Sequence, residues 1–179
     1  PALLCGLPNP RDRHEVRPGE VAAVASELAA RYRHVVVNVS HGTEDVGAMT
    51  GGEGSTITRT LLSAAQVVVG VGAPTPVGVA RLLDWVADVR ALVPAVTLHL
   101  VVNHAPPSRF HRAELEEELL RTFAPASLSF LPFDRRVLDA AWDGRPVTAG
   151  GWARAVEALA AQVLPPVTQP AASRGRPKW

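Results

Sequence analysis

Residues 66–105, QVVVGVGAPTPVGVARLLDWVADVRALVPAVTLHLVVNHA, contain two short apolar runs separated by an amphipathic segment. The runs at 66–73 and 98–105 are rich in valine and apolar at successive positions, which is typical of strands buried on both faces of a parallel sheet. The segment between them has an apolar stripe at helical spacing, formed by Val79, Leu82, Leu83 and Val86. The stretch therefore predicts a strand–helix–strand unit with parallel strands and a right-handed crossover.

The same alternation continues on both sides of this unit. Further apolar runs predict strands at 2–7, 34–40 and 127–133. Amphipathic segments predict a helix from Pro18, one that holds Ile57, Leu61 and Leu62, and others at 76–92, 111–123 and about 150–164. We expect an α/β fold, with a mostly parallel, doubly wound sheet and helices on both of its faces.

Composition excludes several classes of protein. The chain has 179 residues, is 47% hydrophobic and 20% charged, and has 18 basic against 17 acidic residues, so its body is neither disordered nor a basic nucleic-acid coat. We expect residues 1–164 to form a single domain and residues 165–179, which are rich in proline and arginine, to form a disordered tail.

Location is predicted from what the sequence lacks. No apolar run is long enough for a transmembrane segment, and no basic region precedes the first apolar run as in a secretion signal. Cys5 is the single cysteine, so an internal disulfide is impossible and a cytoplasmic location is expected. The chain begins with Pro1 instead of Met, which suggests processing or a longer product.

A glycine-rich segment, GGEGST at 51–56, is similar to a phosphate-binding loop, because small residues let backbone N–H groups converge on an anion. A P-loop also needs a lysine before its Ser or Thr, and here Gly54 directly precedes Ser55. The alternative is a glycine-rich loop in which Ser55 caps the following helix. The only lysine is Lys178, in the tail, so a mechanism that needs a lysine within the folded part is excluded.

The predicted strand at 34–40 ends at a position of chemical interest. In nucleotide hydrolases an acidic residue at the end of such a strand holds Mg²⁺ through its water shell. This chain has Asn38, whose amide accepts a hydrogen bond from a metal-bound water but carries no charge. Glu44 and Asp45 lie in the next loop. In one interpretation their carboxylates supply the negative charge that Asn38 lacks; in the other they are only solvated.

Four passages, taken in order, resemble those of the MinD/ParA-type ATPases, the deviant Walker A (SIMIBI) class that positions chromosomes, division septa and surface machinery in bacteria. The passages are VVVNVS (35–40), LLSAAQVVVGVGAPTPVGVARLLDW (61–85), LHLVVNHAP (98–106) and FLPFDRRVLDAAWDGRPV (130–147). The resemblance covers residues 2–164 and implies a P-loop NTPase-like, three-layer α/β/α fold. The lysine-bearing first unit of the family has no counterpart, so the chain resembles the carboxyl-terminal two-thirds of such a protein.

The resemblance also implies a binding site. Asn103 corresponds to the asparagine that contacts the adenine edge, and Pro132 to Asp134 correspond to the second wall of the base pocket. A carboxamide offers both a donor and an acceptor to a purine; the alternative is that Asn103 caps the turn before Pro106. ATP and Mg²⁺ are the implied cofactors, a homodimer is the implied assembly, and the loop 38–56 is the implied switch.

The tail carries a separate motif. SRGRPKW (173–179) resembles the AT-hook core, in which an extended Gly-Arg-Pro segment lies in a narrow A·T minor groove. Arg174, Arg176 and Lys178 would then contact DNA, whereas the alternative is a basic tail that only aids solubility. The tail lacks the amphipathic periodicity of a membrane-anchoring helix.

Two functions follow from the sequence. The first is a MinD/ParA-like ATPase for positioning, such as chromosome partitioning or cell division, that is incomplete or degenerate for hydrolysis. The second is a non-catalytic interaction or DNA-binding module of the same fold. Whether the chain is an enzyme stays open, and its six histidines lack the spacing of a zinc site. A transferase on the same sheet edge has no acid, base or nucleophile constellation to support it.

The tryptophans Trp85, Trp142 and Trp152 are interpreted as core or subunit contacts.

Overall fold

The structure is a computed structural model that describes residues 2–4, 16–39 and 53–164. Its elements, in chain order, are α1 (Pro18–Arg31), α2 (Glu53–Ala64), β1 (Val67–Gly72), α3 (Pro76–Leu92), β2 (Thr97–Ala105), α4 (Arg109–Thr122), β3 (Ser127–Pro132), α5 (Arg135–Asp143) and α6 (Gly151–Val163). Within this part of the chain, none of the helices is both long and apolar enough to cross a membrane.

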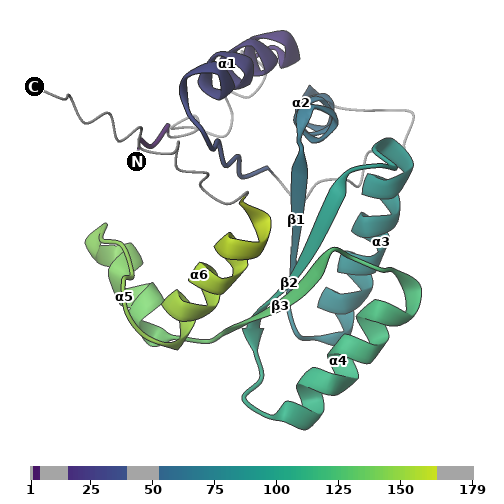
Figure 1. The fold of residues 1–179 in the computed structure, drawn as a ribbon, viewed down its shortest axis with the longest axis vertical. Helices are drawn as coiled ribbons and strands as arrows, with labels where there is room; N and C mark the ends of the chain where they lie inside the picture. The colour runs from purple at the N-terminus through teal and green to yellow at the C-terminus, as the bar shows by residue number, and fades with distance from the viewer. Residues whose placement is uncertain (1, 5–15, 40–52, 165–179) are drawn as a thin grey trace, which may run out of the picture.

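The three strands form one parallel sheet in the order β1-β2-β3. Figure 1 shows α3 and α4 on one side of this sheet and α6, with α5 beyond it, on the other side. The predicted strand–helix–strand unit at 66–105 is confirmed, and so is the α/β class with helices on both faces of a parallel sheet.

The core lies between the sheet and the α3–α4 layer. Side chains of a strand alternate between its two faces, and Leu98, Leu100 and Val102 of β2 all join the same apolar cluster as Val86 of α3 and Leu119 of α4. Each of these five is at most 1% exposed. Burying a side chain of this size contributes about 1.5–3 kcal/mol, so this layer is the main source of stability.

Helix α3 approaches β1 closely because β1 contains glycine. A Cβ atom at Gly70 would lie 2.6 Å from Cζ3 of Trp85, and one at Gly72 would lie 2.9 Å from Cδ2 of Leu82. Trp85 therefore occupies space that any other residue at position 70 would fill. The interpretation of Trp85 as a core residue agrees with its contact with the apolar cluster.

The opposite face of the sheet holds a buried polar pair. His99 of β2 is 4% exposed, and its Nδ1 lies 2.7 Å from Oγ of Ser127, its register partner on β3. Desolvation by burial lowers the pKa of His99 below its ordinary value of 6.5, so the neutral imidazole is the form that suits this position.

Two predicted strands are absent from the part of the chain that the structure describes. Residues 2–4 and 34–39 have no regular structure, and Leu3 and Val36 are 87% and 86% exposed. Apolar, β-branched composition fits a pleated, half-buried surface, but a strand forms only where a neighbouring strand pairs with its backbone. No described strand pairs with either segment, so the strand predictions at 2–4 and 34–39 are wrong; positions 5–7 and 40 lie outside the described residues.

The structure bears on two smaller expectations. Helix α2 begins at Glu53, two residues before Ser55, so Ser55 lies inside the helix and not at the position that precedes it. Trp142 is 91% exposed near the end of α5, so it is not a core residue of the described chain, and its interpretation as a subunit contact stays a prediction.

Gly70→Ala is expected to lower the free energy of unfolding by about 1–3 kcal/mol, because the new methyl group overlaps Trp85 in a packed layer. Chemical denaturation monitored by tryptophan fluorescence measures the change. Gly19→Ala is the control, since a Cβ there meets nothing within 4 Å, and it should leave stability unchanged or raise it. Equal stability of the two variants would contradict the close approach.

Candidate functional site

A hollow of about 130 Å³ opens beyond the carboxyl ends of the strands, where ligands bind in open parallel sheets. It lies where the ends of β2 and β3 meet the first turns of α5 and α6. Its lining residues are Val71, Asn103, His104, Leu131, Pro132, Phe133, Asp134, Val137, Leu138 and Trp152. The structure thus brings together three residues that the sequence analysis predicted as one site, Asn103, Pro132 and Asp134.

The size of the hollow limits what it can hold. Pockets for drug-sized ligands are typically about 300–1,000 Å³, so this hollow has room for a single ring system and not for a whole nucleotide. A larger open groove of about 440 Å³ follows α1, but residues of one helix and its cap line it and no polar groups converge there from other elements. The hollow at the strand ends is therefore the better candidate.

Asn103 stands at an irregularity in the sheet. It pairs with Leu131, the next register pair is Ala105 with Pro132, and His104 between them has a φ of 56°. The backbone N–H of His104 donates a hydrogen bond of 3.0 Å to Oδ1 of Asn103. The carboxamide oxygen therefore supports this backbone turn directly, whereas the amide nitrogen has no protein partner among the described residues.

Apolar and aromatic groups form the walls. The rings of His104 and Phe133 meet edge to face with centroids 5.5 Å apart, and Phe133 is 59% exposed. On the α6 side, a Cβ atom at Gly151 would lie 3.6 Å from Cγ of Pro132, so the start of α6 packs against the end of β3 and carries Trp152 to the hollow.

Asp134 fixes the start of α5. Its Oδ1 accepts hydrogen bonds from the backbone N–H of Arg136 at 3.1 Å and from Nε of Arg136 at 2.9 Å, and its Oδ2 accepts one from Nη2 at 2.8 Å. The side chain of Asp134 is 10% exposed. The Arg136 side chain is the main cause of a lowered pKa for this carboxyl, with backbone donation from Arg136 and Trp152 adding to it and desolvation opposing it.

The ion pair of Asp134 and Arg136 also contacts the N-terminal end of α6. Gly150, with a φ of 107°, lies against the guanidinium of Arg136, which leaves no space for a side chain at that position. Asp134 and Arg136 thus hold the first turns of α5 and α6 around the hollow. Both carboxylate oxygens of Asp134 already accept hydrogen bonds from Arg136. Asp134 therefore positions the helix starts that form this wall of the hollow.

The remaining predicted residues do not join this site in the described structure. Asn38 is exposed, in the segment without regular structure, and does not line the hollow. Glu44 and Asp45 of the predicted switch, and Arg174, Arg176 and Lys178 of the predicted DNA contact, lie outside the described residues. Within residues 2–4, 16–39 and 53–164, no group of three or more His, Cys, Asp or Glu side chains could hold a metal ion.

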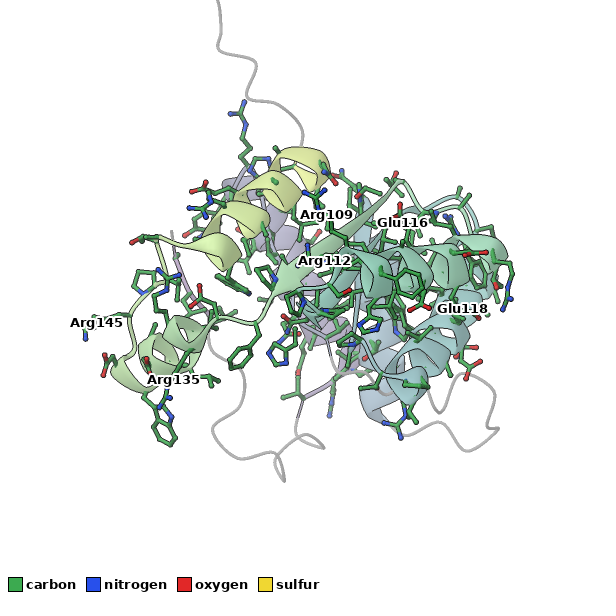
Figure 2. All side chains as sticks on the ribbon, turned by 90° about the horizontal axis from the view of Figure 1, so that it is seen from below. Arg109, Arg112, Glu116, Glu118, Arg135 and Arg145 are labelled. Atoms are coloured by element: carbon green, nitrogen blue, oxygen red, sulfur yellow. The ribbon has the colours of Figure 1, made fainter. Side chains whose placement is uncertain are left out.

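Sequence reasoning missed several lining residues, chiefly His104, Leu138 and Trp152. The available signal was local: paired glycines at 150–151 directly precede Trp152, and such a pair permits close packing at a helix start. Helix α5, which supplies Leu138, was not predicted at all. Figure 2, seen from below, shows Arg109 and Arg112 on α4 lying apart from Arg135, at the start of α5, and from Arg145, beyond its end.

The chain was also compared with known proteins. No family model matches it, and no curated protein matches it.

Asp134→Asn is expected to lower the midpoint of thermal unfolding at pH 7, because the variant keeps the shape of the cap but loses the ion pair with Arg136. A carboxyl whose pKa is lowered on folding stabilises the protein above its ordinary pKa of 3.8, and this contribution is lost as the pH falls through the lowered value. The difference between wild type and variant should therefore shrink below about pH 4.

Asp143→Asn is the matched control, since its ion pair with Arg145 is widely exposed on both sides. It should leave the unfolding midpoint unchanged at both pH values. A gap between wild type and Asp134→Asn that persists at low pH would show that the charge of Asp134 is not what holds the two helix starts.

Proposed function

We propose that this chain binds a purine nucleotide through its base in the hollow at the strand ends, as a MinD/ParA-like module for intracellular positioning in bacteria. The observation that supports the proposal most is the convergence of Asn103, Pro132 and Trp152 from three separate elements on one hollow. ATP is the nucleotide that the sequence resemblance implies, and chromosome partitioning or septum placement is the kind of role that it implies.

The chemistry of the hollow supports a flat heteroaromatic ligand. Its walls are mostly apolar and aromatic, and one carboxamide with a free N–H₂ group provides directional hydrogen bonding. A pocket of this composition holds a ring by contact area and orients it by a small number of polar groups. The limited volume fits the base alone, so sugar and phosphates would lie outside the hollow.

The proposal assigns binding and no hydrolysis to this chain. Phosphoryl transfer in P-loop proteins depends on a lysine at the phosphates and on an acidic residue near Mg²⁺. The only lysine here is Lys178, and Asn38 stands at the end of the run that resembles the family's acidic strand end. If Mg²⁺ accompanies the nucleotide, Asn38, Glu44 and Asp45 are the residues expected near it, and a homodimer is the expected assembly.

Asn103→Ala is expected to weaken binding of Mg·ATP by about 1–3 kcal/mol, because the variant removes the carboxamide that would donate to and accept from the purine edge. Isothermal titration calorimetry of the full chain measures the affinity. Thr97→Ala is the control: Thr97 is an exposed polar residue at the opposite end of the same strand and should leave the affinity unchanged. Equal affinity of wild type and Asn103→Ala would refute the assignment of this hollow.

A second function, a non-catalytic DNA-binding module, is favoured by a different observation. The segment SRGRPKW has the Gly-Arg-Pro core that lies in A·T minor grooves, and it carries the only lysine of the chain. This function needs neither a phosphate lysine nor an acidic metal residue, so the same departures from the ATPase pattern agree with it.

Arg176→Ala is expected to abolish tight binding to an A·T-rich duplex and to reduce the slope of log K against log salt by about 0.9 for the lost phosphate contact. Fluorescence anisotropy at several salt concentrations, with a G·C-rich duplex beside it, measures both effects. Arg121→Ala removes one positive charge from the α4 surface and serves as the control. Full-strength binding by Arg176→Ala would exclude the tail as the DNA contact.

A further inference from the structure

Helix α5 carries an apolar side chain that faces away from the body of the protein. Arg135, Leu138, Asp139 and Trp142 stand at positions i, i+3, i+4 and i+7, which share one face of a helix. All four are exposed, Trp142 at 91% and Leu138, at the rim of the hollow, at 50%. We call these four residues the outward face of α5. Val137, on the opposite side of the helix, is only partly exposed.

Little of the described chain covers this helix. None of the nine residues of α5 is buried by it, and Figure 1 shows α5 at the margin of the molecule, beyond α6. Its start is held by the Asp134 cap and by the ion pair of Asp134 with Arg136. Helices shorter than about 12 residues are marginal in water unless something packs against them. A second element on the outward face would therefore stabilise α5.

The charges of α5 run opposite to the order that a solitary helix favours. Carboxylates stabilise the first turn of a helix and cations the last, because of the helix dipole. The first turn of α5 begins with Arg135 and has no acidic residue, and its last turn has no basic residue. Arg135 also precedes Asp139 by four positions, which is the less favourable order for such a pair. Neither residue forms a salt bridge with the described part of the chain.

An antiparallel copy of α5 complements this order of charges. Reversing one helix brings its positively charged start beside the acidic half of the other, with Leu138 next to the partner's Leu138 at the centre. Arg135 of one protomer then lies beside the partner's Trp142 and Asp139, an aromatic face and a carboxylate that both attract a guanidinium. Because the contact is the same in both directions, it closes after two chains.

We propose that the outward face of α5 is the contact surface of a two-fold homodimer. Trp142 and Leu138 form its apolar centre, and Arg135 of each protomer pairs with Asp139 of the other. The proposal goes beyond the proposed function, because this contact needs no nucleotide and does not depend on what the hollow binds.

Analytical ultracentrifugation of the full chain without nucleotide, over a range of protein concentrations, measures the association. One short helix from each protomer is a small interface, so wild type is expected to dimerise with a dissociation constant in roughly the micromolar range. Trp142→Ala should raise this constant by roughly tenfold or more, since a tryptophan at the centre of an interface is typical of a hot spot. Phe110→Ala is the matched control: Phe110 is an exposed aromatic residue on α4, and its loss should leave the association unchanged.

Charge reversal tests the antiparallel orientation. Arg135→Asp sets a carboxylate against the partner's Asp139, and Asp139→Arg sets a guanidinium against the partner's Arg135, so each variant alone should stay monomeric over the same range. When the two variants are mixed in equal amounts they should associate, because each contact then joins opposite charges. Both reversals move α5 toward the charge order that its dipole favours, so a loss of association would not reflect an unfolded helix.

Several outcomes would overturn the proposal. They are a wild type that stays monomeric, undiminished association of Trp142→Ala, and mixed charge variants that do not associate. Association of wild type only in the presence of Mg·ATP would also overturn it and leave the proposed function standing. A wild type that dimerises as expected but does not bind Mg·ATP would overturn the proposed function and support the α5 contact.

Discussion

The burial of β2 on both of its faces is the constraint on which the rest of the structure depends. β2 pairs with β1 on one edge and with β3 on the other, and the residues from Leu98 to Val102 are at most 4% exposed. With both edges and both faces occupied, this strand has no freedom to shift its register without moving the apolar layer against α3 and α4. Its carboxyl end is therefore a fixed point, and Asn103 lies there, at the first residue where the exposure rises.

The register break after Asn103 connects that fixed point to the site. Regular pairing would continue to alternate side chains across the two faces, whereas the irregularity between Asn103 and Ala105 leaves His104 with a positive φ and aims its N–H at the Asn103 side chain. Such breaks are common where a sheet ends beside a binding site, because they redirect a side chain at small cost to the core. The ion pair of Asp134 and Arg136 then holds the start of α5 against that of α6, so the hollow is bounded by parts that do not depend on a ligand for their positions.

The sequence predicted the central architecture because its signals there are local. Valine-rich runs with a helical stripe between them determine β1, α3 and β2, and the polar residues at the strand ends follow from parallel pairing. Predictions failed where the outcome depends on a partner: the runs at 2–4 and 34–39 have strand composition, yet no described strand pairs with them. Helix α5 was not predicted, although its apolar positions recur at helical spacing, because it has only nine residues and its start is set by the Asp134 cap. Asn103 and Pro132 were predicted to lie together from a resemblance in order and spacing, but which atoms of Asn103 are free depends on the turn at His104, which no pattern of residue types reveals.

Base recognition and phosphate chemistry are physically separable in such a domain. The groups around the hollow come from the ends of β2 and β3 and from α5 and α6, and none of them requires a lysine or a metal ion. Hydrolysis would require charges that neutralise phosphate oxygens, and these belong to other parts of a nucleotide site. The hollow at the strand ends is therefore shaped without a lysine or a metal ion among its lining residues, and a base bound there would not need the residues that transfer a phosphoryl group. In this chain the groups at the ends of β2 and β3 would set which ligand is bound, and the hydrogen bond from His104 N–H to Asn103 Oδ1 orients the carboxamide among them.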